Sequence, residues 1–247
     1  MRYEMMRPHQ IRQSIAERVP VVLPLGVLEY HGEHLAVGLD TLVVVKCLEC
    51  LEAEQPLVIL PPFTYGAASY AVAGPEGTGS VQVGAEALLP LAQQLFTSLL
   101  RIGFRNIHVV VHHQTENFAA GMPTDLAFKL AARQAIFAFL EQQHGEGWWG
   151  NPAMADYYAE HDAGKDPFNW IKAHPLMTPE ITKTFPFDHA GLGETSLLLA
   201  LAPEGVEMSR VAEGGHWYVK GAEAANADLG RQGVDMVLAR LRTLLFS

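Results

Sequence analysis

The stretch VPVVLPLGVLEYHGEHLAVGLD, residues 19–40, decides both how the chain folds and where its chemistry lies. Its first part, residues 19–26, is a short apolar run rich in β-branched residues that ends in Pro and Gly, which predicts a buried strand. The polar part that follows contains potential metal ligands: Glu29, His31, His34 and Asp40. Since parallel sheets bind ligands beyond the carboxyl ends of their strands, a site is expected here.

Strand and helix signals alternate along the rest of the chain. Apolar runs at residues 56–63 and 106–113 predict further strands, and residues 197–201 form a short apolar segment. The spacing of apolar residues predicts helices over residues 40–54, 84–103, 117–143 and 221–246. This alternation favours an α/β fold with a mainly parallel sheet covered on both faces, built as one domain over residues 1–247.

One long segment, residues 144–188, breaks this alternation and is rich in Gly, Pro and aromatic residues. Irregular segments of this length are usually functional or disordered, and the aromatics argue against disorder. We interpret the segment as a lid or pocket wall, in which Trp148, Trp149 and Trp170 are candidates to cover a small, flat, cyclic substrate. The alternative is that these tryptophans are core or subunit-interface residues.

The composition argues against several kinds of partner. The 247 residues are 49% hydrophobic, which is enough for a sizeable core, and 27 Asp and Glu outweigh 17 Lys and Arg to give a net charge of −10. Nucleic acids and anionic membranes bind clustered cations, so neither is an expected partner. Because the sequence also lacks a membrane-length apolar run and an N-terminal apolar signal, we expect a cytoplasmic protein.

The only two cysteines, Cys47 and Cys50, have the spacing of a redox motif. They lie inside a helical apolar pattern, however, and no second pair completes a zinc site. We interpret them as buried or partly buried structural thiols.

The residues after the first strand suit a metal ion. Glu29 and His31 are two positions apart, so an extended chain places them on the same side, and a loop returns Asp40 at the start of the next helix. Carboxylates together with imidazoles suit Zn²⁺ or Mn²⁺. The alternative is a solvated polar loop in which Asp40 caps a helix.

Further clusters combine histidine with acid. In HVVVHHQTEN, residues 108–117, a β-branched strand runs directly into His112, His113, Gln114, Glu116 and Asn117. In FDHAGLGETS, residues 187–196, His189 and Glu194 flank a glycine-rich turn, which alternatively is only a tight turn before a helix. Each cluster alone is moderate evidence, but all of them lie in loops of an α/β pattern, as an assembled metal site requires.

These segments resemble the creatininase family. PLGVLEYHGEHLAVGLD, residues 24–40, is similar to the family segment Pro-x-Gly-x-x-Glu-x-His-Gly-x-His-Leu-x-x-x-x-Asp, with matches at Glu29, His31, Gly32, His34, Leu35 and Asp40. DHAGLGETSLLLALAPEGV, residues 188–206, is similar to a later family segment, with matches at His189, Ala190, Gly191, Glu194, Thr195 and Ser196. PEGTGSV at 75–81 and GFRNIHVVV at 103–111 also resemble family segments, so the resemblance spans residues 19–210.

The resemblance implies a three-layer α/β/α fold, commonly a homohexamer, with one or two divalent metal ions, zinc or manganese, that serve to hydrolyse ring or amide C–N bonds. It implies that Glu29 binds one metal, His31 binds the other and Asp40 bridges them. Glu116, just before Asn117, and Glu194 match acidic ligand positions, and His189 matches the histidine proposed as proton shuttle.

The sequence departs from the family pattern after the third predicted strand. Counted without gaps, the metal-binding histidine of the family falls on Gln114, and His113 stands one position earlier. Either a small bulge lets His113 serve as the ligand, or one metal has lost a ligand, since Gln binds zinc less well than His. Creatinine is therefore not assumed to be the substrate.

Metal chemistry provides the expected mechanism. A bound divalent metal lowers the pKa of its water toward about 7 and polarises the substrate carbonyl, which the hydroxide attacks. His189 would carry the proton to the leaving group, and His34 is a second candidate that alternatively orients Glu29 or Asp40. Ser69 and Ser80 lie in segments expected to line the substrate pocket, and no GxSxG motif makes either a nucleophile.

The sequence does not identify the substrate, and three hypotheses follow from it. The first hypothesis is an amidohydrolase that opens a small cyclic substrate or cleaves an amide C–N bond. The family also includes ring-opening C–C hydrolases of diketo-inositols of the 3-dehydro-scyllo-inosose type, which use similar metal chemistry. A third hypothesis, a non-catalytic protein with a structural metal, is less favoured because structural zinc sites are usually closed by four protein ligands.

Overall fold

The computed structural model describes residues 1–116, 118 and 120–246. A parallel sheet in the order β2-β1-β3-β4 forms its centre. Strands β1 (Val21–Leu25) and β3 (Ile107–Val111) lie in the middle, with β2 (Val58–Ile59) and β4 (Ile171–Pro175) at the edges. Both central strands are buried along their whole length because helices cover both faces of the sheet. The α/β fold with a mainly parallel sheet is thus confirmed.

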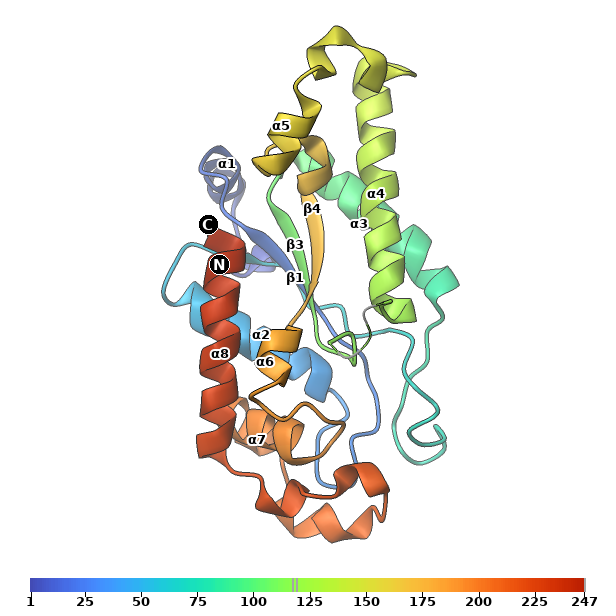
Figure 1. The fold of residues 1–247 in the computed structure, drawn as a ribbon, viewed down its shortest axis with the longest axis vertical. Helices are drawn as coiled ribbons and strands as arrows, with labels where there is room; N and C mark the ends of the chain where they lie inside the picture. The colour runs from blue at the N-terminus through green and yellow to red at the C-terminus, as the bar shows by residue number, and fades with distance from the viewer. Residues whose placement is uncertain (117, 119, 247) are drawn as a thin grey trace.

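The helices form a layer on each side of the sheet (Figure 1). They are α1 (Pro8–Ala16), α2 (Leu39–Glu52), α3 (Ala85–Ile102), α4 (Pro123–His144), α5 (Tyr157–Asp162), α6 (Pro179–Thr182), α7 (Leu192–Leu201) and α8 (Ala227–Phe246). Short 3-10 helices span Tyr3–Met5, Trp148–Gly150, Pro152–Met154, Pro167–Asn169, Pro203–Gly205, Met208–Glu213, Trp217–Val219 and Ala222–Ala224. Because neighbouring strand residues point to opposite faces, Val21 packs with α3 and α4 whereas Val22 packs with α2, α7 and α8.

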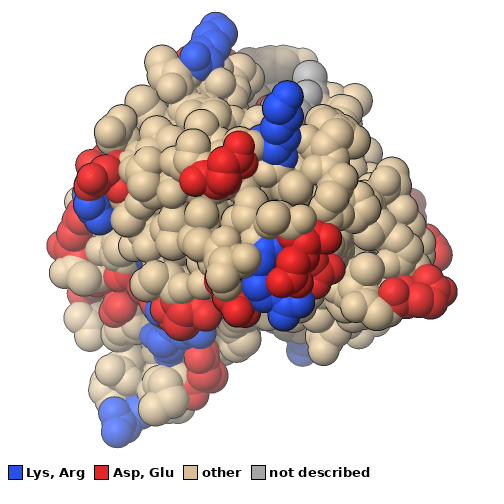
Figure 2. All heavy atoms as spheres, turned by 90° about the horizontal axis from the view of Figure 1, so that it is seen from below, with Lys and Arg blue, Asp and Glu red and all other residues tan. Residues whose placement is uncertain are grey.

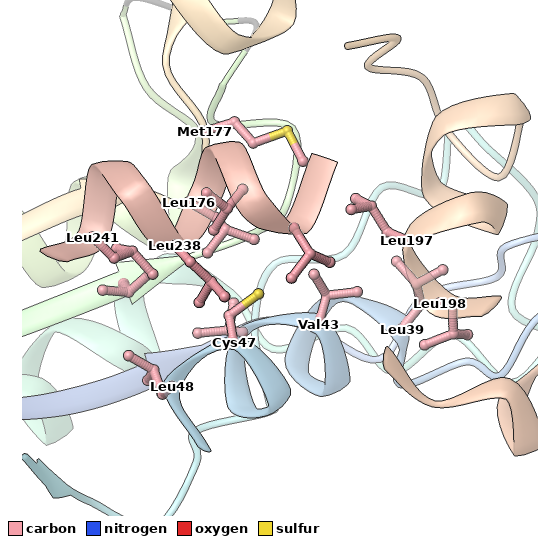
Figure 3. Close-up of a cluster of buried hydrophobic side chains, with 14 of the residues drawn as sticks. Leu39, Val43, Cys47, Leu48, Leu176, Met177, Leu197, Leu198, Leu238 and Leu241 are labelled. Atoms are coloured by element: carbon pink, nitrogen blue, oxygen red, sulfur yellow. The ribbon is translucent and has the colours of Figure 1, made fainter. Parts of the chain in front are cut away.

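The layer of α2, α7 and α8 is held by a dense apolar cluster. Figure 3 shows side chains from all three helices meeting between them: Leu39, Val43, Cys47 and Leu48 of α2, Leu197 and Leu198 of α7, and Leu238 and Leu241 of α8. Helix α8 approaches α7 closely because Gly230 has no side chain, and a Cβ there would collide with the carbonyl oxygen of Ser196. Burial of each such large apolar side chain contributes about 1.5–3 kcal/mol, so this packing fixes the start of α2 and α7.

Some elements differ from the sequence expectation. Strand β4 lies within residues 144–188, where an irregular segment was expected, and its burial is only partial because it is an edge strand. Helix α4 begins at Pro123 rather than at 117, since proline suits the first helical position; residue 117 lies outside the described residues. Cys47 is buried as expected, whereas Cys50 is exposed.

The first part of segment 144–188 lies at the amino-terminal edge of the sheet. Helix α4 runs from the carboxyl edge to the amino edge, and Ile171 pairs there with Ile107, the first residue of β3. Figure 1 shows the end of α4 and α5 at the top, away from the carboxyl ends of the strands. Residues 176–188 then continue past the carboxyl edge, so only this later part lies on the side of the clustered histidines and acids.

The outer surface carries charges of both signs. Figure 2 shows the face seen from below in Figure 1, where acidic and basic side chains lie close together around broad uncharged areas. Within the described part of the chain, none of the helices combines the length and the apolar character needed to span a membrane.

Candidate metal centre

The loop after β1 places Glu29 and His31 side by side, and both are buried. Nδ1 of His31 lies 2.9 Å from the backbone carbonyl oxygen of Glu29, so it donates its proton there and leaves the lone pair of Nε2 for another partner. Gly32 follows with φ of +73°, and a Cβ at this position would meet the ring of His34. The absence of a side chain at Gly32 therefore leaves room for the ring of His34.

Asp40 lies in the first turn of α2, as expected, and its two carboxylate oxygens face different histidines. Oδ1 is 3.4 Å from Nε2 of His31, and Oδ2 is 3.2 Å from Nδ1 of His113. The same nitrogen of His113 lies 3.2 Å from Oε2 of Glu29. The positive end of the α2 dipole favours a carboxylate at this place. Asp40 thus belongs to two groups of donors at once.

The structure brings His113, and not Gln114, into the cluster. Nε2 of His113 lies 3.1 Å from the carbonyl oxygen of Ala67 and donates to it, which leaves Nδ1 for Glu29 and Asp40. Gln114 has a left-handed φ of +55° and directs its amide toward His189, with 3.5 Å between Nε2 and Nδ1. This turn places His113, rather than Gln114, beside Glu29 and Asp40.

Glu194 enters the cluster from the first turn of α7. Oε2 accepts a 2.7 Å hydrogen bond from the backbone N–H of Ala190 and lies 3.7 Å from Nε2 of His31. The preceding carboxylate, Asp188, accepts hydrogen bonds from the backbone N–H groups of Gly191, Gly193 and Glu194 at 3.1, 2.8 and 3.2 Å. Asp188 therefore caps α7, and the cap fixes where Glu194 points.

Glu116 lies behind the donor groups rather than within them. Its Oε1 is 2.9 Å from Nδ1 of His112, and Nε2 of the same ring is 3.3 Å from Oε1 of Glu194. The family resemblance implied that Glu116 is an acidic ligand, but among the described residues the acid grouped with His31 and Asp40 is Glu194. The ring of His112 lies between Glu116 and Glu194 and so separates Glu116 from this group.

His189 lies against the donor groups. Its ring stacks on that of His31, with centroids 4.4 Å apart, and its Nε2 donates to the carbonyl oxygen of Tyr30 at 2.9 Å. Glu29, His31 and His189 together form one of the compact groups able to hold a metal ion. The structure thus places the expected proton shuttle in direct contact with a candidate ligand.

The side chains of His34, Ser69 and Ser80 lie close to the candidate metal ligands but make no hydrogen bond with them in the described structure. Nε2 of His34 is 3.0 Å from the hydroxyl of Thr195, so this histidine bonds to α7 and not to Glu29 or Asp40. Ser69 approaches through its backbone, whose N–H donates to Oε1 of Glu29 at 2.7 Å. The hydroxyl of Ser80 accepts from the backbone N–H of Tyr30 at 2.9 Å and is buried. The serines therefore support the loop after β1.

The three tryptophans of segment 144–188 do not reach this cluster within one chain. Trp148 packs against Phe168, Trp149 is 52% exposed, and Trp170 stacks near Arg105 and Phe139. All three precede β4, at the amino-terminal edge of the sheet, so they cannot cover the metal donors of their own chain. The sequence pattern showed an irregular aromatic segment but not the edge at which it lies.

The sequence did not indicate that Phe187 and Tyr218 lie beside the site, and it gave His112 no role beyond its place in the second cluster. The ring of Phe187 lies edge-on to His112, with centroids 5.8 Å apart. The ring of Tyr218 lies 5.1 Å from that of His189, and its hydroxyl donates to the carbonyl oxygen of Val72. For Tyr218, the sequence signal that was available is the aromatic-rich run GGHWY at residues 214–218.

Attraction between the buried histidines and carboxylates determines the pKa shifts in the cluster. Burial by itself lowers the pKa of His31, but Asp40, Glu194 and Glu29 outweigh it and raise this pKa to about 9. Burial likewise lowers the pKa of His113, but the nearby carboxylates of Asp40 and Glu29 outweigh it and raise this pKa to about 10. Although burial raises the pKa of Asp40, the neighbouring His31 and His113 hold it well below the usual range. Asp40 is therefore ionised, and its negative charge favours a bound cation.

The donor set fits divalent metal ions. Among the described residues, Glu29, Asp40 and His113 form one group and His31, Asp40 and Glu194 another, with the ligand atoms of each group within 4.8 Å of one another. Oε2 of Glu29 and Nε2 of His31 are buried without a hydrogen-bond partner in the described structure. Such atoms are costly to bury without a partner, and a bound cation would supply one. Imidazole and carboxylate ligands suit Zn²⁺ and Mn²⁺.

Fold and donor set define an α/β protein with a candidate two-metal centre at the carboxyl ends of its strands. The chain belongs to the creatininase family, whose model, described as creatinine amidohydrolase, matches residues 4–245. This family consists of metal-dependent hydrolases, so the family and the enzyme class expected from the sequence are confirmed.

Named relatives agree with this membership. Creatinine amidohydrolase of Pseudomonas putida is 25% identical over 195 residues, which cover 78% of this chain and 68% of that protein. 3-Dehydro-scyllo-inosose hydrolase of Thermotoga maritima is 25% identical over 202 residues, or 82% of this chain. The match covers 56% of the latter protein, so this chain spans little more than half of its length.

Solved structures of creatininase share the fold. A manganese form of creatininase superposes with a TM-score of 0.72 at 17% identity, covering 100% of this chain and 99% of that one. A zinc-zinc form of a creatininase mutant gives a TM-score of 0.73 at 16% identity and covers 100% and 98%. At this level of identity the likeness concerns the fold.

Proposed function

We propose that this chain hydrolyses an amide C–N bond, in a ring or in a small amide, with divalent metal ions held between the loops after β1 and β3 and the start of α7. Asp40 carries the proposal, because its two oxygens face His31 and His113, which belong to separate donor groups. A carboxylate between two ligand sets suits a two-metal hydrolase. The relative named creatinine amidohydrolase supports the reaction class.

In this proposal Glu29, His113 and Asp40 would hold one cation, and His31, Glu194 and Asp40 would hold the other. The chemistry of the donors and the zinc and manganese forms of similar structures support these metals. A bound metal ion supplies Lewis acidity toward the substrate carbonyl and an activated water. Glu116 and His112 orient Glu194 from behind.

His189 is the proposed proton carrier. Its Nε2–H is held by the carbonyl oxygen of Tyr30, so Nδ1 is the atom that takes up or releases a proton. Stacking on His31 keeps the ring beside the donor groups, and the amide of Gln114 lies 3.5 Å from Nδ1. His34, bonded to Thr195, is proposed to position the start of α7 rather than to carry protons.

Metal-replete protein tests this proposal on creatinine, small formamides and other cyclic amides, with product analysis by mass spectrometry. Hydrolysis that is lost in His189→Ala, at unchanged metal content, is the expected result. Absence of C–N cleavage across this panel, in protein that binds two equivalents of metal, would overturn it.

A second candidate is ring opening by C–C cleavage next to a carbonyl in a cyclic diketone. The relative of Thermotoga maritima named 3-dehydro-scyllo-inosose hydrolase supports it. A cyclic polyol ketone added to the same panel separates the candidates, because C–C cleavage gives an open-chain acid without release of an amine.

Three broader properties belong to the same proposal. A single domain over residues 1–247 is in keeping with the family match over residues 4–245. A homo-oligomer, such as the homohexamer implied by the family resemblance, would cover exposed aromatics such as Trp217, which is 87% exposed. A cytoplasmic location is supported by the free thiols of Cys47 and Cys50.

A further inference from the structure

A second polar cavity lies at the amino-terminal edge of the sheet, at the other end of the strands from the metal donors. It has a volume of about 190 Å³. Its polar wall consists of Arg18, Arg105, Asn106, His108, Asn169 and Lys172. Arg18 follows α1 and Lys172 belongs to β4, so segments far apart in the sequence converge on this cavity. None of the described residues that line it is Asp or Glu.

The cations of this cavity lack the ion pairs that other cations of the chain make. Lys46, Lys129 and Arg210, for example, each lie within 3.1 Å of a carboxylate oxygen. Within the described structure, Arg18, Arg105 and Lys172 make no such contact, although acids outnumber bases by 27 to 17 in the whole chain. Three unpaired cations around one small cavity cost free energy through mutual repulsion unless an anion joins them.

Arg105 is held rigidly in place. Its guanidinium lies 4.5 Å from the ring centroid of Trp170 and 4.8 Å from that of Phe139. Its Nη1 donates to the carbonyl oxygens of Leu100 and Phe104, both at 2.8 Å. These contacts leave Nε and Nη2 as donors without a hydrogen-bond partner among the described residues. A guanidinium that is oriented before a ligand arrives binds it with little loss of side-chain entropy.

A chain of hydrogen bonds fixes other residues that line the cavity. The side-chain amide of Asn106 donates to the carbonyl oxygen of Arg18 at 3.1 Å, which holds Arg18 in a left-handed conformation with φ of +53°. The oxygen of that amide lies 2.8 Å from Nε2 of His108, so His108 carries its proton there. Nδ1 of His108 then accepts from Nε2 of His174 at 3.2 Å. Asn169 faces the cavity while donating to Asp166, whose side chain is buried behind it.

We propose that this cavity binds a small oxyanion of the phosphate class, with Arg18, Arg105 and Lys172 as its charged donors. The volume suits one such anion with its remaining water. Guanidinium groups match the oxygen geometry of phosphate, and charge-assisted hydrogen bonds are the strong ones. The site lies at the opposite edge from the proposed two-metal centre and does not depend on the function of that centre.

Calorimetric titration of the metal-loaded protein with inorganic phosphate, at constant ionic strength set by chloride, tests the site. The expected result is saturable binding that becomes about tenfold weaker or more in Arg18→Gln and in Lys172→Gln. Arg12→Gln is the matched control, since Arg12 is an exposed cation on α1 that does not line the cavity, and it should bind phosphate like the unaltered protein. Circular dichroism spectra of each variant verify that it is folded.

The metal centre is a competing place for phosphate. Chelated protein is therefore titrated as well, and binding at the cavity should persist there with the same dependence on Arg18 and Lys172. Absence of saturable binding in both forms, or equal binding by Arg18→Gln, Lys172→Gln and the unaltered protein, would overturn the proposal. Binding that disappears on chelation and ignores both substitutions assigns the phosphate to the metals instead.

Discussion

Nε2 of His112 lies 3.3 Å from Oε1 of Glu194, and both side chains are buried. The other nitrogen of the ring is 2.9 Å from Glu116, so a line of three side chains runs from β3 to the first turn of α7. Glu194 thus faces His112 with one carboxylate oxygen and His31 with the other. An imidazole between two carboxylates fixes where a candidate ligand points.

Replacement of His112 by Asn should weaken metal binding without removing a ligand. Loss of a residue that orients a ligand typically costs about 10–100-fold in metal affinity. Competition with a chromogenic chelator measures the effect, which should fall on one of the two metal equivalents. His9→Asn, on the exposed surface of α1, is the control. Unchanged affinity in His112→Asn would show that Glu194 needs no such support.

Asp40→Asn should lower the content of both metals, because Asp40 belongs to both donor groups. His31→Ala should lower mainly one. Elemental analysis after dialysis against metal-free buffer gives the stoichiometry. Asp125→Asn is a matched control: Asp125 is also a buried acid in the first turn of a helix, α4, where it accepts from the backbone N–H of Met122 at 2.5 Å. Full metal retention in Asp40→Asn would contradict the shared role.

Chelation should abolish hydrolysis and leave the fold intact. The apolar clusters on the two faces of the sheet contain none of the candidate metal ligands. We therefore expect the core to stay packed when the metal ions are removed. The melting temperature should fall, because removal of a ligand that binds only the folded state removes its contribution to stability. Circular dichroism before and after EDTA tests whether the fold persists, and activity after re-addition of zinc or manganese tests whether the metal is catalytic. Unfolding on chelation would instead indicate a structural metal.

The stability of the protein should fall as the pH drops from about 6.5 toward 4. Burial, and then the charge of Lys172, lowers the pKa of His108 to about 4; burial, His108, Arg240, Lys172 and Lys129 lower that of His174 to about 3. In the unfolded chain both titrate near 6.5, so in this range the unfolded state binds more protons and gains stability relative to the folded one. The full contribution is present above pH 6.5.

Urea unfolding of chelated protein at several pH values measures this effect, which amounts to about 3 kcal/mol for His108 near pH 4. His174→Gln should flatten the decline relative to the unaltered protein, and His9→Gln should not. The same decline in His174→Gln as in the unaltered protein would contradict the assignment of low pKa values to this pair.

Much of the fold and of the candidate site could be predicted from local sequence. Residues 19–26 and 106–113 read as buried strands because they lie between helices on both faces, and the histidines and acids follow them directly. The carboxyl ends of neighbouring parallel strands meet at one edge, so these side chains had to come close together.

Other features depend on contacts that local sequence does not encode. The choice of His113 over Gln114 rests on a left-handed turn and on the carbonyl oxygen of Ala67, from a distant loop. The position of Trp148 and Trp170 depends on which edge the chain reaches after the long α4 helix. Tyr218 meets His189 only through the tertiary fold.

Gly230 connects the terminal helix to the chemistry of this protein. It sets how closely α8 lies against α7, and α7 presents Glu194 on its first turn. Substitutions along α8 can therefore shift a ligand without altering any motif residue. Helix α8, which carries none of the signature residues, therefore takes part in positioning the candidate metal centre of this chain.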